Sequence, residues 1–317
     1  MTITQLQYAL ALAEHGNFTL AAEKCFVTQP TLSMQIQKLE EELGVLIFDR
    51  SKKPIQLTQV GEKIIEQARR IVNESERIQD IIDIYKGFVG GDFKLGIIPT
   101  VMPVLLPMFL NTFIKKYPKV NLIIEERNTA DIIQKLKNGH LDAGILATPL
   151  EDEEIKERVL YYEPFVGYIP SNSNLFQKEK IQPEDLDANK LLLLEDGHCF
   201  TDGVLNICKT KFEKSTDKFT LKSGSFETLI QLANEGLGMT LLPYLHTLNI
   251  PEKDRNKLKH FEKPEPSREI SLVHTKNELK IQIVEALHST IQGVIRGAIA
   301  FQDVKIISPL PKRGETI

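Results

Sequence analysis

The sequence predicts an α/β protein with a separate helical unit at its N-terminus. Residues 17–58 carry apolar side chains at helical spacing on either side of a tight turn. Residues 58–86 repeat apolar or small side chains at alternating spacings of three and four, the pattern of one long helix. From Phe93 onward, short apolar runs alternate with amphipathic segments, which indicates parallel strands joined by helices.

The segment 17–58 predicts two helices joined by a turn. Thr19 is a suitable N-cap for a helix over 20–26, and the turn falls at 27–29. Pro30 suits the first turn of a second helix, which Gly44 ends. The buried face of this second helix is predicted to consist of Leu32, Ile36, Leu39 and Leu43.

The opposite face of the second helix carries short and amide side chains that can reach base edges and phosphates in a major groove. A basic stretch then precedes residues 54–58, which predicts a two-stranded wing beside the phosphate backbone. The predicted contacts to DNA are Thr28, Gln29, Pro30, Thr31, Ser33, Gln35, Lys38, Arg50, Lys52 and Lys53. The alternative is an ordinary helical pair with a solvated charge cluster, because residues 1–58 hold five Lys or Arg and six Asp or Glu.

Four runs of residues in this region resemble the LysR-type transcriptional regulators: 18–22, 28–33, 39–44 and 46–50. The resemblance extends over nearly the whole chain, apart from the last fifteen residues. It implies a winged helix-turn-helix, a long dimerising helix and a two-lobed α/β regulatory domain similar to the periplasmic binding proteins. It also implies promoter double-stranded DNA and RNA polymerase as partners.

Residues 59–87 predict a linker helix that pairs with a second copy of the chain. The expected seam is Ile64, Ala68, Ile71, Ser75, Ile78, Ile82 and Tyr85. A helix of this length spans about 40 Å at about 1.5 Å per residue, and its narrow apolar stripe suits a partner helix, so we expect a homodimer. The alternative is a helix that lies along its own domain.

The regulatory domain is expected over 88–302, after a glycine-containing hinge. Lobe I would contain 92–162 and 268–302, lobe II would contain 163–267, and 303–317 would form a tail. The expected strands are 93–98, 122–126, 143–147, 165–168, 190–194, 240–242 and 269–274, and the expected helices are 104–116, 130–138, 205–213, 226–235 and 279–296. Two lobes with crossing connections create a cleft, which is a usual place for a small ligand.

Cys199 and Cys208 form the most informative pair of side chains in the second lobe. Their spacing does not suit zinc, because a zinc site needs about four ligands and only His198 is near. His198 could lower the pKa of the Cys199 thiol, and a thiolate attacks oxidants. Oxidation to a sulfenic acid and condensation with Cys208 would then give a reversible disulfide. The alternative is that both are small buried hydrophobes, as expected for Cys25 in the first unit.

The run Gly197-His198-Cys199, followed by Cys208, is similar to that of the peroxide-sensing OxyR-type branch of the LysR-type regulators. The resemblance implies that Cys199 is the peroxidatic thiol and Cys208 the resolving thiol. It further implies that Thr100, Thr129, Gly197, His198 and Arg268 bind hydrogen peroxide, that the homodimers assemble into a homotetramer, and that a cellular thiol system reduces the disulfide. Phe200 and the Pro-rich and Lys/Arg-rich tail depart from the pattern of that branch.

Composition limits the remaining possibilities. The chain has 317 residues, 42% of them hydrophobic and 26% charged, which indicates a globular protein of two or three domains. Without a signal peptide or a long apolar run, we expect a cytoplasmic protein with no membrane contact, no metal and no cofactor. Two other functions stay open: a LysR-type regulator with an organic co-inducer held by Thr100 and Thr129, and a thiol peroxidase that uses Cys199. The DNA-binding head argues against a dedicated enzyme.

Overall fold

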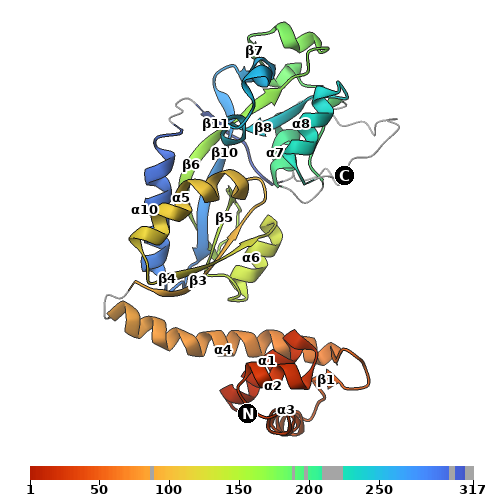
Figure 1. The fold of residues 1–317 in the computed structure, drawn as a ribbon, viewed down its shortest axis with the longest axis vertical. Coiled ribbons are helices and arrows are strands. Elements are labelled where there is room, and N and C mark those ends of the chain that lie inside the picture. Colours follow the sequence, from red (N-terminus) through yellow and green to blue (C-terminus); the bar gives the residue numbers. More distant parts are fainter. Residues whose placement is uncertain (86–88, 188–189, 196–198, 209–223, 300–303, 311–317) are drawn as a thin grey trace. The chain divides into compact units, whose positions relative to one another are not determined.

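The computed structural model describes residues 1–85, 89–187, 190–195, 199–208, 224–299 and 304–310 (Figure 1). The chain divides into two compact units, which are treated separately below. One unit comprises residues 1–88 with 138–140, and the other comprises 89–137 and 141–317. No helix among the described ranges is long and apolar enough to cross a membrane.

The first unit is a winged helix-turn-helix. Its elements are α1 (Ile3–His15), α2 (Phe18–Lys24), α3 (Gln29–Leu43), β1 (Phe48–Asp49), β2 (Gln56–Leu57) and α4 (Gln59–Tyr85). Strands β1 and β2 pair antiparallel and form the predicted wing. Helix α3 begins with proline in its first turn and ends at Gly44, whose φ of 69° is readily adopted by glycine. The turn between α2 and α3 and both ends of α3 confirm the prediction.

Helix α2 begins earlier than predicted, and its N-cap differs. Asn17 is the N-cap, and its Oδ1 accepts hydrogen bonds from the backbone N–H groups of Thr19 and Leu20 at 2.8 and 3.2 Å. Thr19 therefore lies inside the helix, and the prediction that it caps the helix was wrong. Both residue types cap helices well, so composition alone did not separate them. Leu43, predicted to be buried, is 37% exposed at the end of α3.

Helix α4 has two different halves. Ile65, Ala68 and Val72 are buried in the hydrophobic core of the first unit, which also includes residues of α1, α2 and α3. Further along, Ile78 is 63% exposed and Tyr85 is 92% exposed. The prediction of one continuous seam was therefore wrong for the first half, because Ala68 packs inside its own unit. The exposed apolar side chains of the second half remain available to a partner helix.

The second unit is built on a sheet with the order β4-β3-β5-β10-β6-β9-β7, in which β11 also pairs with β10 and β8 with β6. Its strands are β3 (Gly91–Ile97), β4 (Val120–Glu126), β5 (Ala143–Thr148), β6 (Ile155–Tyr168), β7 (Lys180–Ile181), β8 (Thr240–Pro243), β9 (Leu258–Phe261), β10 (Glu265–Thr275) and β11 (Val304–Ile306). Strand β3 runs parallel to β4 and β5, as predicted, whereas β10 runs antiparallel to β5 and β6.

Among the described residues of the second unit, the α-helices that cover this sheet are α5 (Met102–Lys116), α6 (Thr129–Lys137), α7 (Cys199–Ile207), α8 (Phe226–Asn234), α9 (Tyr244–Thr247) and α10 (Ile281–Ile295). Short 3-10 helices occur at Asn174–Gln177, Pro183–Asp185 and Glu252–Lys257. Helices α5 and α10 lie side by side on one face of the sheet, and α6 lies on the other (Figure 1). Helices α5, α6, α8 and α10 confirm the predicted positions.

Two separate hydrophobic cores give the second unit its two lobes. The first core gathers side chains from β3, β5, α5, α6 and α10, and the second gathers side chains from β8, α7, α8 and the end of β6. Strands β6 and β10 run through both lobes as a long antiparallel pair, with Arg268 opposite Glu163. The pair places these two residues where the chain crosses between the cores.

Several parts of the second lobe differ from the sequence prediction, including the strands β7 and β9, which were not predicted. Residues 190–194 do not form a strand, because only Leu191 makes an isolated bridge, with Met239. Helix α7 begins at Cys199, six residues before the predicted start, and ends at Ile207, while residues 209–213 of the predicted helix lie outside the described residues. The tail expected beyond the regulatory domain contributes β11, which pairs in parallel with β10.

Candidate functional site

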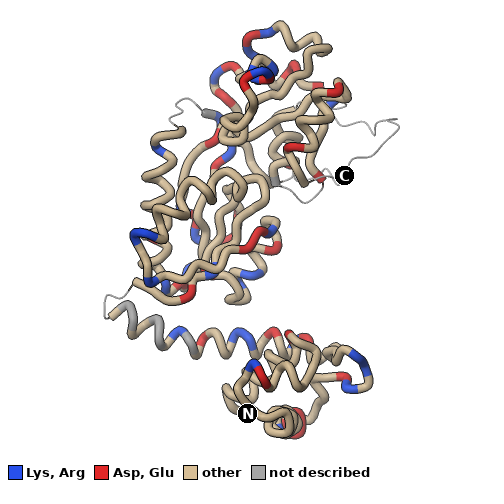
Figure 2. Tube along the Cα trace, viewed as in Figure 1, with Lys and Arg blue, Asp and Glu red and all other residues tan. Residues whose placement is uncertain are grey.

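The residues predicted to contact DNA lie on or beside α3 and in the wing of the first unit. Thr28, Gln29, Pro30 and Lys38 are exposed on or just before α3, and Thr31, Ser33 and Gln35 are half-buried. Three of these side chains already have hydrogen-bond partners. Gln35 Oε1 accepts a hydrogen bond from Gln5 Nε2 at 3.3 Å, and the hydroxyls of Thr28 and Thr31 lie 2.8 Å apart. Lys52 and Lys53 are exposed in the wing, whose basic residues are blue in Figure 2.

Arg50 has a structural role that the sequence prediction missed. Its guanidinium makes a 2.7 Å ion pair with Glu40 and lies 5.5 Å from the centre of the Phe18 ring. Glu40 is buried, and its other oxygen accepts the backbone N–H groups of Ile47 and Phe48 at 2.8 and 3.1 Å. Arg50 therefore helps to fix the wing against α3. Glu40 lies four residues after Ile36, on the buried face of α3. This spacing could have predicted a buried carboxylate that needs a cationic partner such as Arg50.

The centre of the second unit is a buried charge network around Arg268. Arg268 is 4% exposed and Glu163 is 1% exposed, and their side chains form an ion pair with an Nη2–Oε2 distance of 2.7 Å. Glu163 also accepts the backbone N–H of Leu245 at 2.8 Å. Arg268 Nη1 donates to the Thr100 hydroxyl at 2.9 Å, and Nη2 donates to the Thr100 carbonyl at 3.1 Å. The network fixes a cationic group beside a predicted peroxide contact.

Thr100 and Thr129 lie at the same edge of the sheet. Thr100 follows β3, and Thr129 is the first residue of α6, after the neighbouring parallel strand β4. The backbone N–H of Arg127 donates to the carbonyl of Ile97 at 3.1 Å, which ties the two strand ends together. The Thr129 hydroxyl is buried and has no hydrogen-bond partner among the described residues. An unpaired buried hydroxyl costs free energy, so a small hydrogen-bonding ligand here would stabilise the site.

Aromatic rings connect this network to helix α7. Phe200, the residue after Cys199, is 4% exposed, and its ring centre lies 5.3 Å from the Arg268 guanidinium carbon. The Phe200 ring is 5.1 Å from Phe165 and 5.0 Å from Phe226, and Phe226 is 4.6 Å from His246. Phe200 therefore attaches the first turn of α7 to the buried arginine. Phe200, which departs from the pattern of the OxyR-type branch, therefore has a structural role in this chain.

His246 is held neutral at the end of this aromatic chain. Burial lowers the pKa of His246 to about 4, the positive charge of Arg268 acts in the same direction, and Glu227 opposes both. The sequence prediction did not include His246, because nothing in its local pattern indicates that α9 faces Arg268.

We expect this histidine to make the folded state sensitive to acid. Its pKa in the folded state lies below the ordinary histidine value of 6.5, so the folded state binds fewer protons than the unfolded state. The contribution to stability is complete above about pH 6.5 and is lost as the pH falls through 6.5 toward 4, by up to about 3 kcal/mol. The variant His246→Gln should lose less free energy of unfolding than the parent between about pH 7 and about pH 4 in urea titrations. Equal losses in the two proteins would contradict this assignment.

The two cysteines of the second lobe lie at opposite ends of α7. Cys199 is the first residue of the helix, and the backbone N–H of Cys208 donates to the Val204 carbonyl at 3.2 Å just beyond its end. Nine steps of about 1.5 Å separate the two Cα atoms by about 13 Å along the helix axis. A disulfide requires a Cα separation below about 7 Å, so α7 must unwind before this pair can be joined.

The surroundings of the two sulfur atoms are described to different extents. Cys208 is 5% exposed and lies within the core of the second lobe. Gly197 and His198, both predicted to contact peroxide, lie outside the described residues, as does the side chain of Cys199. Cys25 packs against the core of the first unit, as predicted, and burial raises the pKa of its thiol. Among the described residues, no group of three His, Cys, Asp or Glu could hold a metal ion.

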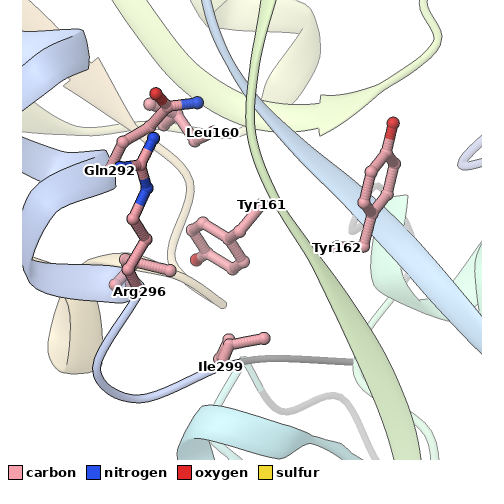
Figure 3. Close-up of a pocket in the computed structure, with 7 residues that line it drawn as sticks. Leu160, Tyr161, Tyr162, Gln292, Arg296 and Ile299 are labelled. Atoms are coloured by element: carbon pink, nitrogen blue, oxygen red, sulfur yellow. The ribbon is translucent and has the colours of Figure 1, made fainter. Parts of the chain in front are cut away.

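A separate cavity lies beside β6 and α10 (Figure 3). Its volume is about 180 Å³, and it is lined by Leu160, Tyr161, Tyr162, Gln292, Ile295, Arg296 and Ile299. Tyr161 extends toward α10, where Gln292 and Arg296 lie next to each other (Figure 3). None of the lining residues is a predicted contact for peroxide or for an organic co-inducer. The cavity borders the Arg268 network, because burial and the Glu163 charge raise the pKa of the lining residue Tyr161, while the Arg268 charge opposes them.

Family comparisons match both units of the chain. The family "Bacterial regulatory helix-turn-helix protein, lysR family" matches residues 3–62, and "LysR substrate binding domain" matches residues 86–296. The hydrogen peroxide-inducible genes activator of Pectobacterium carotovorum is 36% identical over 94% of this chain and 98% of its own length. The DNA-binding transcriptional dual regulator OxyR of Escherichia coli K12 is 38% identical over 86% of this chain and 89% of its own length.

Solved structures show the same similarity. A full-length OxyR cysteine-to-aspartate mutant of Pseudomonas aeruginosa has a TM-score of 0.76 and 34% identity, and the match covers 92% of this chain and 98% of that one. A Corynebacterium glutamicum OxyR cysteine-to-serine mutant with bound hydrogen peroxide has a TM-score of 0.62 and 28% identity, over 96% and 98% of the two chains. The similarity extends through the DNA-binding head, the linker helix and the regulatory domain.

Proposed function

We propose that this chain, which belongs to the LysR family of bacterial DNA-binding transcriptional regulators, senses hydrogen peroxide through Cys199 and Cys208 and controls oxidative-stress genes. The observation that carries the proposal is the position of the two cysteines at opposite ends of one short helix, whose first turn is attached to the buried Arg268 through Phe200. In this arrangement, joining the thiols must change the fold of the second lobe. Oxidation by peroxide would therefore change the conformation of the second lobe.

The proposed chemistry has two steps. The Cys199 thiolate attacks one oxygen of hydrogen peroxide, the O–O bond breaks, and the hydroxide that leaves takes up a proton to become water. The sulfenic acid on Cys199 then condenses with the Cys208 thiol, which forms the disulfide and releases a second water. Two electrons pass from the thiols to peroxide, and two external thiols return them when the disulfide is reduced. The chain acts here as a switch that is reset, not as a turnover enzyme.

Each residue near the strand ends has a defined part in this proposal. The Thr100 hydroxyl, which accepts a hydrogen bond from Arg268, and the Thr129 hydroxyl would hold peroxide at the sheet edge, with Gly197 and His198. Arg268 would stabilise the negative charge that develops on the leaving oxygen. Glu163 keeps the guanidinium in place and balances its charge. The proposed roles of Thr100 and Arg268 are supported by their direct hydrogen bond.

The assembly and partners form part of the same proposal. The exposed apolar side chains in the second half of α4 support pairing with a second copy, and we propose that the dimers form a tetramer. Lobe I would comprise 92–162 and 268–302, and lobe II 163–267, so that α7 lies wholly in lobe II. The oxidised regulator would change its promoter contacts and the recruitment of RNA polymerase, and a cytoplasmic thiol system would reduce it.

The test uses the full-length protein on promoter DNA. Footprints of the reduced protein should change when hydrogen peroxide is added, and this change should be absent in the variant Cys199→Ser. A matched Cys25→Ser variant should respond like the parent. A footprint that still changes in Cys199→Ser would rule out the proposed sensor, and a response to an organic acid alone would favour a co-inducer-dependent regulator.

The wing should contribute to affinity without contributing to sequence specificity. We expect the double substitution Lys52→Ala and Lys53→Ala to weaken binding on all sequences and to reduce the slope of log K against log salt by about 2, at about 0.9 per lost phosphate contact. The affinity is measured over a salt series with operator and random duplexes. Lys115→Ala, an exposed lysine of α5, is the control and should leave the slope unchanged. An unchanged slope in the double variant would remove these lysines from the interface.

A further inference from the structure

The C-terminal residues 304–310 are built into the second lobe beside the redox-active helix. Strand β11 lies parallel to β10, with Val304 opposite Glu265 and Ile306 opposite Ser267. The backbone N–H of Ile307 donates to the Ser267 carbonyl at 2.8 Å, next to Arg268 in the chain. This segment therefore continues the sheet immediately beside the central charge network.

The same segment is also attached to helix α7. Asn206 Nδ2, near the end of α7, donates to the carbonyl of Ser308 at 3.0 Å and to the carbonyl of Leu310 at 2.9 Å. Ile307 is 9% exposed and belongs to the same hydrophobic core as Phe200 and Cys208. One side chain of α7 thus binds two backbone carbonyls of a segment about a hundred residues further along the chain.

We propose that residues 304–310 form a strap that positions α7 in its reduced, helical arrangement, with Asn206 and Ile307 as positioning residues for the redox switch. This inference rests on the proposed function. The strap sets how readily α7 unwinds, and it therefore sets the redox potential of the Cys199–Cys208 pair and the rate at which the disulfide forms.

Helix α7 needs such support because it is weak by itself. Nine residues are fewer than an isolated helix requires, and Gly203 in its middle lowers helix propensity further. At its start, Phe200 is held by Arg268, and the Thr201 hydroxyl donates to the Leu194 carbonyl at 3.1 Å. At its end, the described side-chain contacts include the two hydrogen bonds from Asn206. Because the disulfide cannot close until the helix unwinds, contacts that exist only in the helical form favour the reduced state.

The experiment compares two asparagine variants of the full-length protein. Asn206→Ala removes both bonds to the strap, and Asn172→Ala removes a bond from a similar amide to the Gly236 carbonyl elsewhere in the second lobe. Each protein is equilibrated in glutathione buffers, and the Cys199–Cys208 disulfide is quantified by mass spectrometry. We expect Asn206→Ala to favour the disulfide about tenfold, a shift of about 30 mV toward a more reducing potential. Asn172→Ala should match the parent, and equal potentials for all three proteins would overturn the strap.

A second readout separates the strap from the cysteine chemistry. Hydrogen exchange of the α7 amides in the reduced protein should be about tenfold faster in Asn206→Ala than in Asn172→Ala, whether or not peroxide forms the disulfide. Absence of the disulfide in the parent would refute the proposed function alone, whereas unchanged exchange would refute the strap alone. Ile307→Ala and Ile250→Ala form a second matched pair, because both isoleucines are buried in the core of lobe II. Faster α7 exchange only in Ile307→Ala supports the strap, and equal changes in the two variants contradict it.

Discussion

The variant Arg268→Ala is expected to destabilise the second unit by about 3–5 kcal/mol and to abolish the peroxide response. Glu163 is 1% exposed and would be left as a buried carboxylate whose remaining hydrogen-bond donor among the described residues is the Leu245 N–H. The Thr100 hydroxyl and carbonyl would also lose their donors. Phe200 would lose the cation beside its ring, so the first turn of α7 would no longer be fixed. The free energy of unfolding is measured in urea, and disulfide formation is followed in parallel.

A double variant distinguishes the cost of leaving one buried charge unpaired from the cost of losing side-chain volume. Glu163→Gln combined with Arg268→Met removes both charges and keeps similar volumes, and it should recover most of the lost stability but not the peroxide response. Arg158→Ala is the control, because its ion pair with Glu285 lies at the surface and should contribute less than about 1 kcal/mol. If Arg268→Ala proved no more destabilising than Arg158→Ala, the buried network would have no special role in the fold.

The second large effect is expected at Cys208. In the variant Cys208→Ser, peroxide should convert Cys199 to a sulfenic acid that persists, because no second thiol is present to condense with it. A carbon nucleophile specific for sulfenic acids, followed by peptide mass spectrometry, measures the trapped species. In the parent protein the same reagent should label Cys199 weakly, since the disulfide forms instead. The DNA footprint of Cys208→Ser should stay in the reduced pattern.

Cys25 supplies the control for this prediction. The variant Cys25→Ser should form the Cys199–Cys208 disulfide at the parental rate. In the parent, Cys25 packs within the first unit, and burial raises the pKa of its thiol, so this thiol should not take part in the reaction. Sulfenic acid on Cys208 in a Cys199→Ser background, with none on Cys199 in Cys208→Ser, would reverse the assigned roles of the two thiols. A complete absence of labelling in both variants would remove the sulfenic acid from the pathway.

Local patterns were sufficient for much of the first unit. Pro30 and Gly44 each act within a few residues of the chain, and α3 begins and ends where they predict. The cap of α2 was assigned wrongly because Asn17 and Thr19 are both good caps, and only the backbone geometry distinguishes them. The linker helix shows a different limit. Heptad spacing identifies the apolar face of a helix, but it cannot predict whether Ala68 on that face packs against its own unit or against a partner helix.

Long-range pairing explains what the sequence could not predict in the second unit. Glu163 and Arg268 are 105 residues apart and meet because β6 and β10 pair antiparallel. His246 reaches the same network from α9, and the strap reaches α7 from the end of the chain. Arg268 was predicted as a site residue from the family resemblance. Its partner Glu163 could not be predicted without the register of β6 and β10, which places the two residues opposite each other. Residues 190–194 were predicted as a strand because they form an apolar run. The same run is compatible with a buried loop that makes a single bridge, so the pattern did not distinguish the two.

The most direct test of the central claim is a map of the cysteines after brief exposure to peroxide. Reduced full-length protein receives one equivalent of hydrogen peroxide, the reaction is quenched within seconds, and free thiols are labelled before peptide mass spectrometry. A Cys199–Cys208 disulfide with Cys25 still free is the predicted result. Three unmodified cysteines under these conditions would contradict the account and would leave a LysR-family regulator that responds to another signal.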